Sequence, residues 1–199
     1  LTAQVQFASP FGPPGASITA FACDSSGLFY AGGKGLHVSS DNGASWATLP
    51  YPGPQWEDVR SIATDPDGRI FVVYYWGLFV STDHGATWVK KVTANLQTVA
   101  VDPFGRIFAG GPGGVYTSTN SGTTFSRIPS FYDGNDIYDF LFVGTNGIRM
   151  ATMSGIFSTT DGGETWALDD ALRYVHGLKR TTRGTYLAAT QSGLFERAE

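Results

Sequence analysis

Short runs of apolar and β-branched residues, separated by turns rich in glycine and aspartate, make up most of the chain. Such runs with turn signals on both sides are typical of β-strands. The longest candidate for a membrane segment, Ile70–Tyr75, has the length of a strand and is far below the roughly 18 residues of a membrane span. The pattern therefore predicts an all-β protein without membrane insertion.

Two strands and a tight turn between them recur five times. The predicted first strands are Ile18–Cys23, Val59–Thr64, Leu96–Val101, Ile137–Phe142 and Val175–Arg180. In the turns Asp65–Gly68 and Asp102–Gly105, Asp opens the turn, Pro presets φ, and Gly accepts a backbone conformation that a Cβ disfavours. The predicted second strands are Leu28–Ala31, Arg69–Val73, Arg106–Ala109, Ile148–Ala151 and Thr185–Ala188.

A third and a fourth strand complete each unit, joined by a recurring eight-residue motif. The third strands begin at the pairs Gly35-Leu36, Gly77-Leu78, Gly114-Val115, Gly155-Ile156 and Gly193-Leu194. The motif Ser/Thr-x-Asp-x-Gly-x-Thr/Ser-Trp then occurs at Ser39–Trp46, Ser81–Trp88 and Thr159–Trp166, and in altered form at Ser118–Phe125. Neighbouring copies are about forty residues apart, so five units account for the whole chain.

Repeated four-stranded antiparallel units of this length predict a β-propeller with five radially arranged blades in a single domain. The expected blades are approximately residues 15–50, 57–92, 95–129, 136–170 and 174–199. The last unit ends before its motif and fourth strand. Residues 2–9 alternate like a strand, and we expect them to supply the missing strand, which closes the ring and removes an exposed edge.

The motif resembles the Asp-box, or BNR, repeat of sialidases, xyloglucanases, sortilin-type receptors and photosystem II assembly propellers. The Gly-Leu-Phe/His-Val-Ser runs also resemble the periplasmic propellers of some two-component regulators. We expect each Asp to accept backbone N–H groups of its own turn and each Trp to pack between strands. Because the copies lie in separate hairpins, they cannot converge on one ligand, so a structural role is expected for Asp41, Trp46, Asp83, Trp88, Asn120, Phe125, Asp161 and Trp166.

Composition narrows the possible partners. Of 199 residues, 26 are Gly and 15% are charged, which suits a turn-rich β-protein, and the net charge of −4 gives no basic surface for nucleic acid. The single Cys23 excludes an internal disulfide, and its apolar neighbours predict a buried thiol. No His/Cys spacing indicates a metal site, and we expect neither metal nor cofactor. The chain begins at Leu1, which is compatible with a leader or another domain before it, and the composition suits a secreted or periplasmic, monomeric domain.

Variable loops on one face of the propeller are the expected binding region. The loops that join fourth to first strands and second to third strands share this face, which we call the loop face; the tight turns and Asp-boxes share the opposite turn face. Tyr74-Tyr75-Trp76 stands where the third unit has Gly111-Pro112-Gly113, so the blade does not require its bulk. Two interpretations remain, a binding platform or a cover for the core. Together with the channel mouth, the candidates are Trp56, Arg60, Tyr75, Trp76, Gln97, Tyr138, Asp139 and His176.

Three functions stay open at this level. The first is a non-catalytic module that binds a glycan or a protein surface. The second is a glycoside hydrolase with a pair of loop carboxylates, from Glu57, Asp58, Asp133, Asp136 and Asp139. A sialidase-type site is not expected, because few arginines fall on the loop face and such propellers have six blades. The third is the sensor or docking domain of a larger protein.

Overall fold

The computed structural model describes residues 12–13, 17–53, 57–129 and 136–198. All regular elements in this part of the chain are β-strands. Blades 1 and 2 contain β1 (Ile18–Cys23), β2 (Phe29–Gly33), β3 (Leu36–Ser39), β4 (Ala47–Thr48), β5 (Ser61–Thr64), β6 (Ile70–Tyr74), β7 (Gly77–Ser81) and β8 (Val89–Val92). Blades 3 and 4 contain β9 (Thr98–Val101), β10 (Ile107–Gly111), β11 (Gly114–Ser118), β12 (Ser126–Arg127), β13 (Ile137–Val143), β14 (Gly147–Thr152), β15 (Ile156–Thr159) and β16 (Ala167–Asp170). Blade 5 contains β17 (Val175–Arg180), β18 (Thr185–Thr190) and β19 (Gly193–Ala198).

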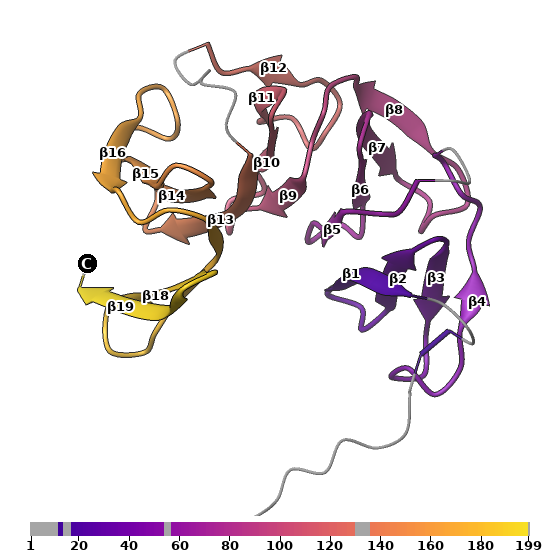
Figure 1. Cartoon of the computed structure of the whole chain (residues 1–199). Helices are drawn as coiled ribbons and strands as arrows, with labels where there is room; N and C mark the ends of the chain where they lie inside the picture. The colour runs from indigo at the N-terminus through magenta and orange to yellow at the C-terminus, as the bar shows by residue number, and fades with distance from the viewer. Residues whose placement is uncertain (1–11, 14–16, 54–56, 130–135, 199) are drawn as a thin grey trace, which may run out of the picture.

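The five sheets form a five-bladed β-propeller. Each sheet is antiparallel and keeps the sequence order of its strands; the first four blades have four strands and the described part of blade 5 has three. Figure 1 shows the blades following one another around an axis as an open arc, with blades 1 and 5 at its ends. The predicted closing strand at residues 2–9 lies outside the described residues.

The first strands of neighbouring blades lie side by side at the centre. Contacts join β1 to β5, β5 to β9, β9 to β13 and β13 to β17. Backbone hydrogen bonds also connect the blades, for example from the Val59 N–H to the Gly33 carbonyl at 2.9 Å. The glycine at position 32 of β2 permits this approach, since a Cβ on Gly32 would lie 2.6 Å from Val59.

The hydrophobic core lies between the blades, not within them. One cluster joins blades 1 and 2 through Tyr30, Leu36 and Ile62, and another joins blades 2 and 3 through Phe71 and Val99. Two more clusters fill the next two interfaces in the same way. Each blade buries both of its faces only when a neighbour stands on each side, which is the energetic reason for the radial arrangement.

The prediction of a buried Cys23 is wrong, and its position in the arc explains why. Cys23 and Phe21 are both exposed on β1, and the Phe21 side chain stacks on Phe29 with ring centroids 5.5 Å apart. Blade 2 covers one side of β1, whereas no described blade packs on the side that carries these residues. Apolar neighbours in sequence therefore did not imply burial at this end of the arc.

Candidate functional site

The Asp-boxes on the turn face have closed hydrogen-bond networks. In the blade 2 copy, Asp83 Oδ1 accepts the Thr87 N–H at 2.8 Å and Oδ2 accepts the Thr87 hydroxyl at 2.6 Å, while Ser81 Oγ donates to Oδ1 at 2.7 Å. The Trp88 indole N–H donates to the Gly85 carbonyl at 3.1 Å. These bonds, first the one from the Thr87 hydroxyl, lower the pKa of Asp83 to about 2. The carboxylate is therefore occupied by its own turn.

The third copy of the motif forms the corresponding hydrogen bonds with the side-chain amide of Asn120 in place of an Asp carboxylate. Asn120 Oδ1 accepts the Thr124 N–H at 3.0 Å, and its Nδ2 donates to the Thr124 hydroxyl at 2.8 Å. A negative charge is thus not needed to close the turn. The Asp-box glycines also contact the preceding blade, since a Cβ on Gly122 would lie 2.7 Å from the Phe71 ring. The motif closes a hairpin and fits it against its neighbour.

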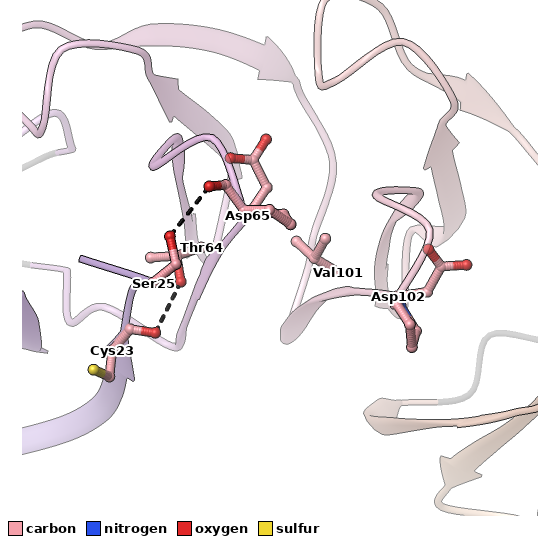
Figure 2. A pocket seen from close by; sticks show the side chains of 8 residues that line it. Cys23, Ser25, Thr64, Asp65, Val101 and Asp102 are labelled. Atoms are coloured by element: carbon pink, nitrogen blue, oxygen red, sulfur yellow. Dashed lines mark hydrogen bonds between the residues drawn. The ribbon is translucent and has the colours of Figure 1, made fainter. Parts of the chain in front are cut away.

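Figure 2 shows a second feature of the turn face, a pocket of about 340 Å³ where the tight turns of blades 1 to 3 approach the axis. Its acidic residues are already bonded. Asp65 accepts backbone N–H groups from Asp67 and Arg69 and pairs with the Arg69 guanidinium at 2.9 Å. Asp102 accepts two backbone N–H groups in the same way and pairs with Arg106 at 2.5 Å. These carboxylates stabilise turns and leave little capacity for a ligand.

Polar residues at the start of the first strands connect neighbouring blades. Thr19 Oγ1 donates to the carbonyl of Val59, and Arg60 Nη1 donates to the carbonyl of Leu96 at 3.3 Å. One residue further on, Ser61 Oγ accepts the Val99 N–H at 3.1 Å. The predicted polar ring at the channel mouth therefore contributes to the interfaces between blades.

Asp139 occupies the position of Ser61 in blade 4. Its Oδ2 accepts the Leu178 N–H of blade 5 at 2.8 Å, and its Oδ1 accepts the Phe140 N–H at 2.9 Å. Burial raises the pKa of Asp139, and the two backbone donors oppose that shift. Its inclusion among the ligand-binding residues stays a prediction, but both oxygens are engaged within the fold.

Tyr138 and His176 lie together on the loop face between blades 4 and 5. Their ring centroids are 4.9 Å apart, and the Tyr138 hydroxyl donates to Asp136 Oδ2 at 3.1 Å. Burial is the main cause of the raised pKa of Tyr138, and the Asp136 carboxylate adds to it. Gln97 is half-buried in blade 3, with its backbone N–H bonded to the Gly110 carbonyl. Among the described candidates, no hydrogen bond or ring contact joins Gln97 to another.

Three of the sequence candidates meet in one pocket of blade 2, which we call the blade 2 pocket. Glu57, Asp58, Arg60, Tyr75 and Trp76 line its volume of about 440 Å³. The Arg60 guanidinium lies over Tyr75 at 4.5 Å from the ring centroid, and the Tyr75 and Trp76 rings meet edge to face with their centroids 4.7 Å apart. Trp76 remains 53% exposed, so much of its indole surface is available to a ligand. Trp56, the remaining candidate of this loop, lies outside the described residues.

Glu57 is the unusual member of this pocket. Its side chain is 6% exposed, yet neither carboxylate oxygen has a hydrogen-bond partner in the part of the chain that the structure describes. The Tyr51 hydroxyl donates to the backbone carbonyl of Glu57 and leaves the carboxylate unbonded. The Tyr51 and Tyr74 hydroxyls lie near the Glu57 charge; burial is the main cause that raises the pKa of Tyr51 to about 12, and the Glu57 carboxylate adds to it.

Sequence reasoning considered Glu57 only as a hydrolase carboxylate and left it out of the binding set. A loop glutamate is most often solvated, but Glu57 is buried near Tyr51 and Tyr74, whose rings meet edge to face at 5.2 Å. The available signal is its position between Trp56 and Val59, where the sequence predicts the first strand of blade 2 to begin. That position anchors Glu57 close to the core.

The comparisons identify one copy of the motif and the fold. The family model described as BNR/Asp-box repeat matches residues 79–90, which are the blade 2 motif and its flanks. No curated protein sequence matches the chain significantly. The resemblance seen in the motif is thus confirmed, and the motif is a BNR/Asp-box repeat.

Solved structures of diverse proteins share the fold. An ancestral GH74 enzyme aligns with a TM-score of 0.73 at 22% identity, over 91% of this chain and 29% of its own. YCF48 from Cyanidioschyzon merolae aligns with a TM-score of 0.64 at 15% identity, over 86% of this chain and 63% of its own. The extracellular domain of the putative hybrid two component system BT4673 from B. thetaiotaomicron gives 0.65 at 16% identity, over 98% of this chain and 33% of its own. This chain thus spans between 29% and 63% of the length of these proteins. The likeness shows the β-propeller fold, which hosts both enzymes and other proteins.

Proposed function

We propose that this propeller is a non-catalytic binding module that recognises a protein or glycan surface with its loop face, centred on the blade 2 pocket. The observation that carries the proposal is the convergence of Arg60, Tyr75 and Trp76 with two acidic residues in one concave site. An exposed aromatic ring beside charged groups is a common composition of recognition sites. The pocket among the tight turns of the opposite face contains carboxylates that are already bonded.

The arrangement of carboxylates favours binding over hydrolysis. Among the described candidates for a catalytic pair, Asp139 bonds two backbone N–H groups and Asp136 accepts the Tyr138 hydroxyl. Glu57 and Asp58 lie in another blade, the first buried and the second exposed. A hydrolase needs an acid and a second carboxylate facing the same bond. Glu57 and Asp58 line one pocket, but the Glu57 carboxylate is buried, and Asp133 lies outside the described residues.

The similar structures are consistent with a recognition role. One solved form of YCF48 is described as bound to D1 peptide, and the BT4673 domain is described as extracellular. By analogy, the loop face of this chain would bind a peptide or a protein surface, within a secreted or periplasmic protein. Sensor or docking function in a larger protein is compatible with the same site.

Paired glycan and peptide arrays test the proposal. We expect the wild-type chain to bind a defined set of probes and Trp76→Ala to lose that binding. Phe104→Ala is the matched control, because Phe104 is 60% exposed in a turn of the opposite face and its removal should leave binding intact. Equal loss in both variants, or no specific binding on either array, would contradict the proposal.

A further inference from the structure

The two end blades of the arc each have one sheet face that no described blade covers. Contacts join the first strands of each pair of neighbouring blades, and no comparable contact joins β17 of blade 5 to β1 of blade 1. Figure 1 shows these two blades at the ends of the open arc. We call the two uncovered surfaces the end faces.

The end face of blade 1 carries Phe21 at a repeat position that is buried in every other blade. The equivalent residues, matched by their pairing with the second strand, are Ile62, Val99, Phe140 and Leu178. Each of them belongs to the apolar cluster between its own blade and the preceding one, and their exposure is 4–7%. Phe21 has no preceding blade in the described arc and is 57% exposed.

The end face of blade 5 carries Leu194 at a second such position. Its equivalents in the Gly-apolar pairs are Leu36, Leu78, Val115 and Ile156. Each of these packs in the cluster toward the following blade and is almost fully buried. Leu194 is 67% exposed. The two end faces therefore carry the two halves of the interface that this chain forms between its neighbouring blades.

The halves also match in size. Between blades 3 and 4, the Phe140 ring packs where blade 3 has a glycine, since a Cβ on Gly110 would lie 2.9 Å from it. In blade 5 the equivalent of Gly110 is Ala189, which is small and exposed. The end face of blade 5 thus offers a small residue at the position where an aromatic ring such as Phe21 would pack.

Lys179 is a charged residue on the end face of blade 5. It occupies the position that Leu141 has in the cluster between blades 4 and 5. A lysine can bury its aliphatic stem and keep its ammonium in water, so it is compatible with a neighbouring blade.

The end faces of one chain do not meet in the described arrangement. Apolar clusters and backbone bonds, such as that from the Val59 N–H to the Gly33 carbonyl, fix each blade against the next. Blade 5 could reach blade 1 of the same chain only if these interfaces repacked. Closure of the ring with residues 2–9, which the sequence predicts, is the competing arrangement and involves residues outside the described part of the chain.

We propose that the end face of blade 5 packs on the end face of blade 1 of a second copy of this chain, as a further inter-blade interface. Repeat arrays that stay solitary need polar terminal faces, whereas both end faces here are apolar. Such a contact is heterologous, because it joins two different surfaces head to tail. It goes beyond the proposed function, does not use the blade 2 pocket, and replaces the monomer that the composition suggested.

Sedimentation velocity of the chain between about 1 and about 100 μM, where micromolar association becomes visible, tests the proposal. We expect a mass of at least two copies that falls toward one on dilution. Phe21→Asp and Leu194→Asp should each stay monomeric, because each places an unpaired carboxylate in an apolar interface. Phe104→Asp and Leu168→Asp are the matched controls, since both residues are similarly exposed but lie in blades 3 and 4, and they should associate like the wild type.

A mixture of the two interface variants tests the head-to-tail orientation. Phe21→Asp keeps the end face of blade 5 intact, and Leu194→Asp keeps that of blade 1. An equimolar mixture should therefore form a dimer through one interface, although neither variant associates alone. This rescue also shows that both variants are folded.

Three results would overturn the proposal. The first is a wild type that is monomeric throughout; if Phe21→Asp then destabilises it far more than Phe104→Asp, blade 5 of the same chain covers this face. The second is association that neither interface variant weakens. The third is an associating wild type whose two variants do not combine in the mixture. The array experiments measure binding at the loop face separately, so the proposed function does not depend on these results.

Discussion

Buried carboxylates on the two faces of this propeller differ in whether they accept hydrogen bonds. On the turn face, Asp83 and Asp102 each accept at least two donors from their own turns. On the loop face, Glu57 is about as buried as Asp102, with 6% and 3% exposure, yet it has no donor among the described residues. The turn face is repeated with little change and holds the blades together. The loop face differs from blade to blade, which is where a fixed scaffold has room for recognition.

The largest expected effect is on the turn face, where the Asp-box meets the preceding blade. Gly122 has φ +76°, and a Cβ there would lie 2.7 Å from Phe71. Gly122→Ala should therefore lower the free energy of unfolding by about 3 kcal/mol, from overpacking together with backbone strain. Urea denaturation measures it.

Gly105→Ala is the matched control for this change. Gly105 has φ +81°, and a Cβ added there would meet nothing within 4 Å, so the substitution isolates the backbone term and should cost about 1 kcal/mol. Equal losses in the two variants would show that packing of the Asp-box against the neighbouring blade contributes nothing.

A smaller effect follows from the charge of the Asp-box. The pKa of Asp83 is about 2, below its ordinary value of 3.8, so its stabilising contribution is complete above the higher value and is lost as pH falls toward the lower one. Asp83→Asn should lower the melting temperature little at pH 7, as the natural Asn120 copy suggests, and should reduce the loss of stability between about pH 4 and pH 2. Asp83→Ala should be less stable than Asp83→Asn at pH 7. Thermal melts across this pH range would contradict the account if Asp83→Asn kept the full acid sensitivity.

The smallest effect on stability is expected on the loop face. Trp76 is 53% exposed and contacts Tyr75 at its edge. Trp76→Ala should change the free energy of unfolding by no more than about 0.5 kcal/mol, while it removes binding. A strongly destabilised Trp76→Ala would show that the ring covers the core, the alternative that the sequence left open.

The architecture could be predicted from the sequence repeat, because the strands and tight turn of each blade recur and four of the five blades also carry an Asp-box motif. The boundaries differ where tertiary contacts decide. β5 begins at Ser61 and not at Val59, since the Val59 N–H bonds to blade 1. This bond connects Val59 to Gly33 of blade 1, a residue that the local pattern does not relate to it.

The site was only partly predictable for a similar reason. Comparison between repeats identified Tyr75 and Trp76 as bulk that the blade does not need, and they line the blade 2 pocket with Arg60. Asp139 bonds to the next blade through Leu178, which is about forty positions away in sequence. Glu57 is buried near Tyr51 and Tyr74, whose rings pack edge to face. Neither can be read from spacing.

The most direct test neutralises one buried carboxylate on each face and compares melting temperatures. Asp102→Asn should lower the melting temperature, because an amide weakens the pair with Arg106. Glu57→Gln should raise it, because the variant removes a buried charge that has no partner among the described residues. Opposite signs in the two variants are the result that this account predicts. A loss of stability in Glu57→Gln comparable to that in Asp102→Asn would show that the Glu57 charge is satisfied within the fold, and would contradict it.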